Sequence, residues 1–328
     1  MALNFHFVSS INTTLKNLMK KKIDLIAVGE LLADFITVDE CDSLFEGEVF
    51  TRYQGGSPAN LAANLARLGK TVTLVSSVGA DGVGRFLINE ISKTGISTDS
   101  IAVQNSSPTS LVLVSRTSGT PDFVAYRLAD CMLKEEDIPL ADILQTRLFH
   151  TTCFALSMQP ARNTILNAAG RALETGAFLS IDLNYHPQIW PDRDDAIQVV
   201  SRFCSANTLV KCSIDDMERL LGNNNLSADS ILQTVHSWGA DLVCLTRGSK
   251  GSITSWDAGK NRYDLQPKPL KVVDATGAGD AFWSGFLASW LDGLDPEGCA
   301  KVGGEVAALK LSRSGPLPKR INLENLTA

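Results

Sequence analysis

The chain has 328 residues, 44% hydrophobic and 20% charged, with 36 acidic against 30 basic residues and a formal charge of −6. This composition is typical of a globular protein with a sizeable core and excludes a largely disordered chain. The charges form no long runs of one sign, so no nucleic-acid-binding surface is indicated, and no apolar run approaches the roughly 18 residues that cross a membrane.

The seven cysteines are scattered and are never spaced as C-x-x-C. Their odd number and spacing argue against a disulfide framework or a zinc knuckle and favour a reducing compartment. Polar side chains at positions 9–14 lie where a signal peptide needs its apolar stretch. We therefore expect residues 1–22 to be an N-terminal extension and the protein to be cytoplasmic.

Short apolar runs rich in β-branched residues alternate with helical patterns along the chain. The runs lie at residues 23–28, 71–75, 147–152, 178–182, 208–210 and 242–246. Periodicity and capping residues predict helices at 57–68, 159–174, 214–221, 229–238, 280–291 and 296–311. This alternation predicts an α/β domain over 23–328, with a mostly parallel central sheet covered by helices on both faces.

Two segments, at about 35–53 and 110–127, interrupt the alternation. In the second, Leu111, Leu113, Phe123 and Ala125 alternate with other residues between turns. We expect both segments to form antiparallel strands without crossover helices. They would make a small sheet that projects from the main domain as a lid.

A loop of small residues precedes the helix predicted at 280–291. Gly277, Ala278 and Gly279 leave their backbone N–H groups unobstructed at a helix N-terminus, where the helix dipole favours an anion. Asp280 follows directly. A carboxylate there can take a hydroxyl proton while the amides stabilise developing phosphoryl charge. The alternative is that Asp280 only caps its helix.

The loop at 274–280, Asp-Ala-Thr-Gly-Ala-Gly-Asp, resembles the D-T-x-G-A-G-D signature of the ribokinase-like, or PfkB-type, carbohydrate kinases. A second signature, a Gly-Gly pair followed by an Asn that opens a helix, matches Gly55, Gly56 and Asn60. The fructokinase and 2-keto-3-deoxygluconate kinase branch is the most similar. The resemblance implies a three-layer α/β/α fold with an antiparallel β-sheet lid, and transfer of the γ-phosphoryl group of ATP to a sugar hydroxyl with Asp280 as the base.

The resemblance also places a sugar between the main sheet and the lid. The residues that match the family's sugar contacts are Asp34, Gly55, Gly56, Asn60, Tyr126 and Arg127. Asp34 would accept hydrogen bonds from sugar hydroxyls. The glycines would allow close approach of the backbone, and the amide of Asn60 offers both a donor and an acceptor.

A second set of positions implies a nucleotide site with ATP and Mg²⁺ as cofactors. The residues that match nucleotide contacts are Asn184, His186, Lys211, Ser213, Thr246, Gly248 and Gly251. Asp216 takes the place of a Glu that organises Mg²⁺ through water in the family, and it is one methylene shorter. The resemblance leaves open a monovalent cation near Asp274, as in some relatives.

The sugar itself is indicated by departures from the family pattern. His186 stands where fructokinases and 2-keto-3-deoxygluconate kinases usually carry Arg, and His binds an anion only when it is protonated. Together with Ser213 and the segment at 184–190, this favours fructose over an acidic sugar. A 2-keto-3-deoxygluconate kinase and a ribose or nucleoside kinase are alternatives of the same class. A sugar- or nucleotide-binding protein that has lost catalysis is the alternative of another class.

Exposed lid edges and the resemblance together favour a homodimer formed through the lid. The expected partners are otherwise a small-molecule sugar and ATP, with neither nucleic acid nor a membrane.

Overall fold

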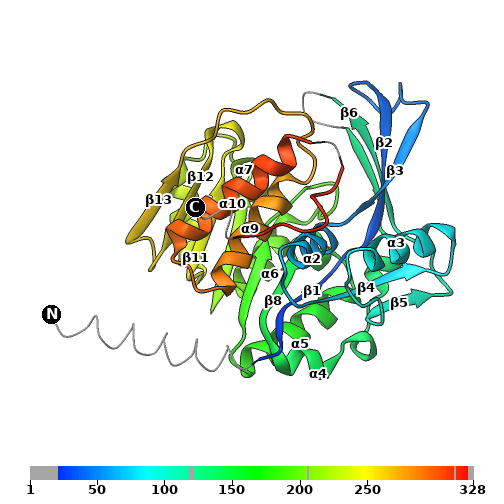
Figure 1. Cartoon of the computed structure of the whole chain (residues 1–328), viewed down its shortest axis with the longest axis horizontal. Coiled ribbons are helices and arrows are strands. Elements are labelled where there is room, and N and C mark those ends of the chain that lie inside the picture. The colour runs from blue at the N-terminus through cyan, green and yellow to red at the C-terminus, as the bar shows by residue number, and fades with distance from the viewer. Residues whose placement is uncertain (1–20, 118–121, 205–206, 314, 324–328) are drawn as a thin grey trace.

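The computed structural model describes residues 21–117, 122–204, 207–313 and 315–323 (Figure 1). The predicted N-terminal extension at 1–22 lies outside these ranges except for its last two residues.

A nine-stranded sheet runs through the centre of the molecule. Its strands, in spatial order, are β13 (Asn261–Leu265), β12 (Ser252–Trp256), β11 (Leu242–Thr246), β10 (Thr208–Ser213), β9 (Phe178–Asp182), β8 (Thr146–Thr152), β1 (Ile23–Val28), β4 (Val72–Gly79) and β5 (Ile101–Gln104). The pairings from β11 to β5 are parallel, whereas β12 and β13 are antiparallel. The carboxyl ends of the parallel strands therefore share one edge, where α/β proteins bind their ligands.

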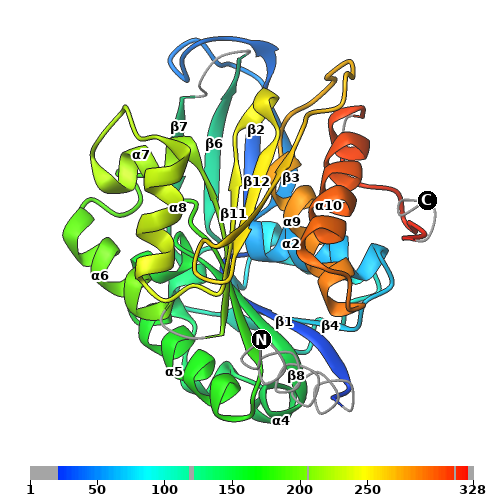
Figure 2. The same cartoon turned by 90° about the vertical axis from the view of Figure 1, so that its left-hand side faces the viewer.

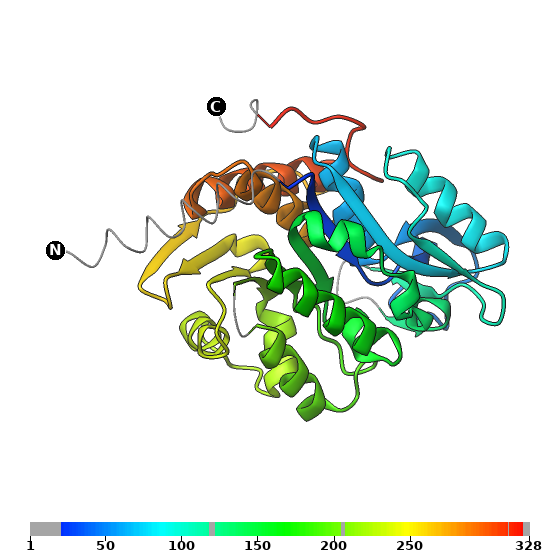
Figure 3. The same cartoon turned by 90° about the horizontal axis from the view of Figure 1, so that it is seen from below.

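Helices cover both faces of this sheet, as the view along the layers shows (Figure 3). One face carries α2 (Ser57–Arg67), α3 (Gly82–Ser92), α9 (Ala278–Leu291) and α10 (Pro296–Leu311). The other carries α4 (Leu140–Gln145), α5 (Ala161–Glu174), α6 (Arg193–Phe203), α7 (Ile214–Leu221) and α8 (Ala228–Ser237). Short 3₁₀ helices lie at Ala129–Met132, Glu135–Asp137, Ala155–Ser157 and Gly248–Lys250.

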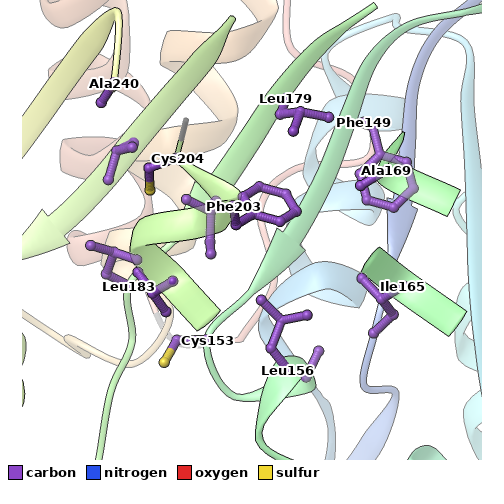
Figure 4. Packing of buried hydrophobic residues seen from close by; sticks show 14 of the residues in the cluster. Phe149, Cys153, Leu156, Ile165, Ala169, Leu179, Leu183, Phe203, Cys204 and Ala240 are labelled. Carbon is purple, nitrogen blue, oxygen red and sulfur yellow. The ribbon is translucent and has the colours of Figure 1, made fainter. Parts of the chain in front are cut away.

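Each face of the sheet has its own apolar core. Strand β1 shows why, because Leu25 and Ala27 belong to one buried cluster while Ile26 and Val28 belong to the other. Successive side chains of a strand point to opposite faces, so a continuous apolar strand supplies both cores. Figure 4 shows part of the second cluster, to which Phe149 of β8, Leu179 of β9 and Ile165 of α5 belong.

A second sheet of four strands rises beyond the main sheet (Figures 1 and 2). Its order is β3 (Phe50–Gly55), β2 (Leu32–Glu40), β6 (Leu111–Arg116) and β7 (Phe123–Tyr126). The β2–β3 and β6–β7 pairs are antiparallel as predicted, but the central β2–β6 pair is parallel. The chain passes through α2, β4, α3 and β5 between these two strands, and such a crossover permits a parallel pair.

The structure confirms the predicted α/β class, with a mostly parallel three-layer domain and a small separate sheet. No helix in the described part of the chain is long and apolar enough to cross a membrane. All seven cysteines are free thiols.

Candidate active site

The first turn of α9 forms the centre of the site. The helix begins at Ala278, and Gly277 before it adopts a left-handed conformation with φ of 72°. Glycine reaches this conformation without steric cost, which lets the loop turn sharply into the helix. The Ala278 N–H donates to the Ala275 carbonyl at 3.2 Å, so it is not unobstructed as predicted. The amides of Gly277 and Gly279 remain the predicted anion donors of the loop.

Asp280 in this turn is held by side chains from α2. The Ser57 hydroxyl donates to Oδ1 of Asp280 at 2.7 Å, and Nδ2 of Asn60 donates to Oδ2 at 2.9 Å. Nε2 of Gln54 donates to Oδ1 of Asn60 at 2.9 Å, which fixes the orientation of the amide. The structure thus brings together two sequence signatures that are 220 residues apart.

The surroundings of Asp280 oppose its ionisation. Burial and the nearby Asp182 carboxylate raise the pKa of Asp280 above its usual value, while Lys211 and the bonds from Asn60 and Ser57 act in the opposite direction. A carboxylate whose pKa is raised toward neutrality is a better general base than an ordinary surface Asp.

A buried ion pair lies next to the predicted anion-binding loop. Nζ of Lys211 contacts both carboxylate oxygens of Asp182, at 2.8 and 2.7 Å. Burial would lower the pKa of Lys211, but the Asp182 and Asp216 carboxylates raise it, so the ammonium keeps its charge. A Cβ on Gly279 would lie 3.2 Å from Nζ of Lys211, which shows how closely this charge approaches the loop.

Asp34 and the Gly55–Gly56 pair form the predicted sugar side of the site. A Cβ on Gly55 would lie 2.2 Å from Oδ2 of Asp34, so a larger residue here would displace this carboxylate. Gly56, with φ of 96°, packs its backbone against the Glu30 carbonyl in the same way. Burial and the charge of Asp280 raise the pKa of Asp34 to about 7.

Glu30 is a member of the site that the sequence analysis did not single out. Its side chain is 3% exposed; Oε1 accepts from the Ser57 N–H at 3.2 Å and Oε2 from the Thr152 hydroxyl at 2.9 Å. Burial raises the pKa of Glu30 to about 8. The carboxyl fixes the turn that presents Ser57 to Asp280. An acidic residue two positions after the apolar strand β1 is the feature of the sequence that could have indicated it.

Tyr126 and Arg127 are not brought to Asp34. Tyr126 pairs with Leu111, whereas Asp34 pairs with Val112, so Tyr126 lies on the opposite face of the lid and is 50% exposed. Arg127 donates from Nε to Asp130 at 2.7 Å, and from Nη1 to the Phe154 carbonyl at 3.0 Å and Ser157 at 2.7 Å. Contact of either residue with a sugar stays a prediction.

The loop after β9 joins the lid to the predicted nucleotide side. The ring of His186 meets Phe123 of β7 edge to face, with centroids 4.6 Å apart. Burial and the nearby Arg219 lower the pKa of His186, so its ring is neutral at pH 7. Asn184 is turned inward, where Oδ1 accepts from the Phe154 N–H at 3.0 Å.

Ser213 and Asp216 lie where β10 runs into α7. The Ser213 hydroxyl accepts from the Asp216 N–H at 3.0 Å and donates to Oδ2 of Asp216 at 2.5 Å. Burial raises the pKa of Asp216 to about 6. No group of at least three potential metal-ligating His, Cys, Asp or Glu residues exists in the described ranges. Asp216 therefore belongs to no cluster of three such residues in these ranges, which suits Mg²⁺ held mainly by water and phosphate oxygens.

The glycine loop after β11 lies at the same edge of the sheet. Thr246 donates from Oγ1 to the Cys212 carbonyl at 3.2 Å, and therefore joins the ends of β10 and β11. Gly248 and Gly251 both have positive φ, of 56° and 78°. A Cβ on Gly251 would lie 2.1 Å from the Leu265 carbonyl, so this glycine is required by the fold itself.

Known proteins match nearly the whole chain. The sequence model of the family described as "pfkB family carbohydrate kinase" matches residues 22–320. The chain is 34% identical over 297 residues to the ATP-dependent 6-phosphofructokinase of Thermoanaerobacterium thermosaccharolyticum, with 90% of each covered. It is 30% identical over 297 residues to a 5-dehydro-2-deoxygluconokinase of Clostridium perfringens, with 88% of this chain and 87% of the relative covered.

Solved structures agree with this result. The fructokinase of Halothermothrix orenii is 34% identical, with a TM-score of 0.75 over 90% of this chain and 100% of that chain. An uncharacterized sugar kinase of Pyrococcus horikoshii, solved in complex with ATP, is 26% identical, with a TM-score of 0.79 over 92% of this chain and 96% of that chain.

The fold and the matches together define a phosphotransferase that acts on an alcohol group. The chain belongs to the pfkB family of carbohydrate kinases, which confirms the family resemblance noted in the sequence.

Proposed function

We propose that this sugar kinase phosphorylates fructose with ATP, and that Asp280 is the base. The pair of hydrogen bonds from Ser57 and Asn60 to Asp280 carries the base assignment. A carboxylate has about four acceptor positions, so two donors leave it free to accept a sugar hydroxyl as well. A carboxylate that served only as a helix cap would not need two side-chain donors from another helix.

In the proposed reaction the sugar hydroxyl oxygen attacks the γ-phosphorus of ATP while the bond to the β–γ bridging oxygen breaks. The hydroxyl proton passes to Asp280, and ADP leaves with the bridging oxygen. The amides of Gly277 and Gly279 would stabilise charge on the transferred group, whereas that of Ala278 donates to the Ala275 carbonyl. The Lys211 ammonium below Gly279 adds a fixed positive charge on the same side.

The residues at the end of β10 fit a magnesium ion held through water. Mg²⁺ in kinase sites is usually bound by one or two carboxylates, waters and substrate phosphates, and it neutralises charge on the β- and γ-phosphates. Asp216 would supply that carboxylate, because its pKa of about 6 leaves it mostly ionised at pH 7 and above. The glycine loop at Thr246, Gly248 and Gly251 would lie along the nucleotide.

The charges around the sugar side favour a neutral sugar. The named relatives include kinases of a phosphorylated sugar and of a keto-deoxy acid. Such an anionic group would need a free cation in the site. The charge of Arg127 is paired with Asp130, whose Oδ2 lies 2.6 Å from Nη2, although Nη2 makes no hydrogen bond. Nε and Nη1 donate to Asp130, Phe154 and Ser157, and the lowered pKa of His186 leaves its ring uncharged. Asp34 is better suited to sugar hydroxyls.

ADP release from ATP and Mg²⁺ tests the substrate directly. Fructose, fructose 6-phosphate, 2-keto-3-deoxygluconate, ribose and adenosine would be compared under the same conditions. We expect the highest kcat/KM with fructose. A preference for either anionic sugar would contradict the neutral-sugar proposal, and saturable sugar binding without turnover would indicate a binding protein.

The base is tested with Asp280→Asn. The variant keeps the size of the side chain but cannot take a proton, so we expect kcat to fall by about 10²- to 10⁴-fold, the usual contribution of a general base. Calorimetry should show sugar binding retained. Near-normal turnover of this variant would contradict the role of Asp280.

We also propose that two subunits pair through their lids in the cytoplasm. The lid exposes apolar side chains to solvent, including Val49 at 58% and Val124 at 43%. Free thiols at all seven cysteines are consistent with a reducing compartment. Light scattering of the purified protein tests the dimer, and replacing Val124 with Asp should shift it toward the monomer.

A further inference from the structure

A buried lysine near the end of α10 contacts the proposed anion-binding loop. Lys310 is 8% exposed, and its Nζ lies 3.3 Å from Oδ2 of Asp274. A Cβ on Gly277 would lie 3.8 Å from Cε of Lys310, so the aliphatic part of the side chain runs beside the glycine that starts α9. Within the described residues, Asp274 is the one hydrogen-bond partner of this ammonium.

The negative charge of Asp274 is unfavourable beside a loop that is proposed to bind phosphate. Its carboxylate lies three residues before Gly277, at the start of the loop that is proposed to bind phosphate. Burial alone would raise the pKa of Asp274, but the hydrogen bonds from Thr276 and the charge of Lys310 outweigh it and lower the pKa. Asp274 is therefore ionised at neutral pH. An uncompensated negative charge here would repel the phosphates of ATP.

The carboxylate nevertheless shapes the loop. Oδ1 of Asp274 accepts from the Thr276 N–H at 2.9 Å, which closes a local turn directly before Gly277. The Val273 N–H donates to the Leu311 carbonyl at 2.8 Å, so the start of the loop is attached to the end of α10. Lys310 lies between these two attachments. The Asp274 carboxylate can therefore accept the hydrogen bond that closes the turn while the Lys310 ammonium neutralises its charge.

We propose that Lys310 is a positioning residue for phosphoryl transfer. Its ammonium neutralises Asp274 and holds the Asp274–Gly277 loop in its anion-binding shape, so that the kinase needs no monovalent metal cation at this loop. A cation from solution would have to compete for Asp274 with an ammonium that the chain itself supplies. This inference rests on the proposed anion-binding role of Gly277, but not on which sugar is the substrate.

The test compares the wild type with Lys310→Met in potassium, ammonium and tetramethylammonium chloride. At equal ionic strength screening is equal, so wild-type kcat/KM for ATP should vary by less than about twofold among these salts. In tetramethylammonium chloride, Lys310→Met should lose about 10- to 100-fold, the range expected when a hydrogen bond to a charged group is lost. Ammonium, which can enter the space left by Nζ, should restore most of this loss.

ADP affinity measured by calorimetry is a second readout, because it needs no sugar. It should weaken in Lys310→Met and recover with ammonium even if fructose is not the substrate. Lys310→Arg keeps the charge and should stay near the wild type. The double variant Asp274→Asn, Lys310→Met removes both charges and should recover part of the affinity, and thermal unfolding shows whether each variant is folded.

Three results would overturn the inference. One is a wild type that is activated more than about tenfold by potassium, a change that screening cannot give at equal ionic strength. Another is a Lys310→Met variant with unchanged kcat/KM and ADP affinity. The third is a folded Lys310→Met variant whose loss neither ammonium nor Asp274→Asn repairs. The wild-type comparison needs no variant, so it decides the cation question even if Lys310→Met does not fold.

Discussion

Replacing Ser57 with Ala should shift the pH dependence of catalysis. The Ser57 hydroxyl donates to Asp280 at 2.7 Å and lowers the pKa of that carboxyl. A hydrogen bond to a charged group contributes about 1.5–3 kcal/mol, and one pKa unit corresponds to about 1.36 kcal/mol. Because Asp280 is only partly buried, water can replace part of the lost bond. We therefore take the lower end, an increase of about one unit in the pKa of Asp280.

The direction of the effect follows from the form that reacts. In the proposed mechanism catalysis needs the Asp280 carboxylate, and losing a donor favours the protonated acid. The acid limb of the kcat profile should therefore move up by about one pH unit, with about tenfold lower activity on that limb and little change at high pH. Stopped assays of ADP from pH 5 to 9 measure the shift.

Ser57→Thr is the matched control, because it keeps a hydroxyl at the same position. It should leave the limb near its wild-type position, while both variants should unfold at similar temperatures. An acid limb in Ser57→Ala that coincides with the wild type would refute the reasoning. So would an equal shift in both variants.

Asp34→Asn should raise the KM for sugar by about 10- to 100-fold, since a charged acceptor is lost, with the KM for ATP unchanged. In the wild type the KM for sugar should rise as pH falls below about 7, because the raised pKa of Asp34 puts its protonation there. Asp34→Asn should abolish this pH dependence of the KM for sugar. If the dependence persists in the variant, a group other than Asp34 titrates. Lys211→Met leaves Asp182 buried without its cation and should lower the free energy of unfolding by about 3–5 kcal/mol in urea titrations. A double variant that also carries Asp182→Asn should recover part of it, and an unchanged midpoint in Lys211→Met would show that the pair contributes nothing.

The main sheet was predictable from its apolar strands. The bounds of β1, β9 and β11, and those of α7 and α10, agree with the predictions to the residue. These elements combine a clear apolar pattern with a capping residue or a charged boundary, such as Ser213 before α7. Local pattern and tertiary environment agree there, so the sequence alone suffices.

Other elements were missed for identifiable reasons. Helix α3 begins at Gly82 within a glycine-rich turn, and only the Asp81 side chain, which accepts from the N–H groups of Val83 and Gly84, marks its start. Glycine is a poor helix former, so the composition indicates a turn instead. Strands β12 and β13 lie at the edge of the sheet, and β12 is rich in polar residues, so its apolar signal is weak.

The candidate site was predicted mainly through the two signatures. The resemblance brought Asn60 and Asp280 into one site, and the structure joins them directly. Glu30 and Lys310 were not singled out. Both are buried ionisable residues whose partners lie on other elements, and which loop packs on which helix cannot be derived from local pattern. The parallel β2–β6 pair of the lid was missed for the same reason.

With Asp280 as the proposed base, the contacts that hold it would also make enzyme activity a measure of complete folding. Its two donors lie 220 and 223 positions earlier in the chain, so the proposed base is held only after both ends of the domain have come together. Contacts of such long sequence separation form late because loop closure must come first. Neither half of the chain could retain activity alone, and during refolding we expect turnover to return with the slowest phase, after the helical signal has recovered.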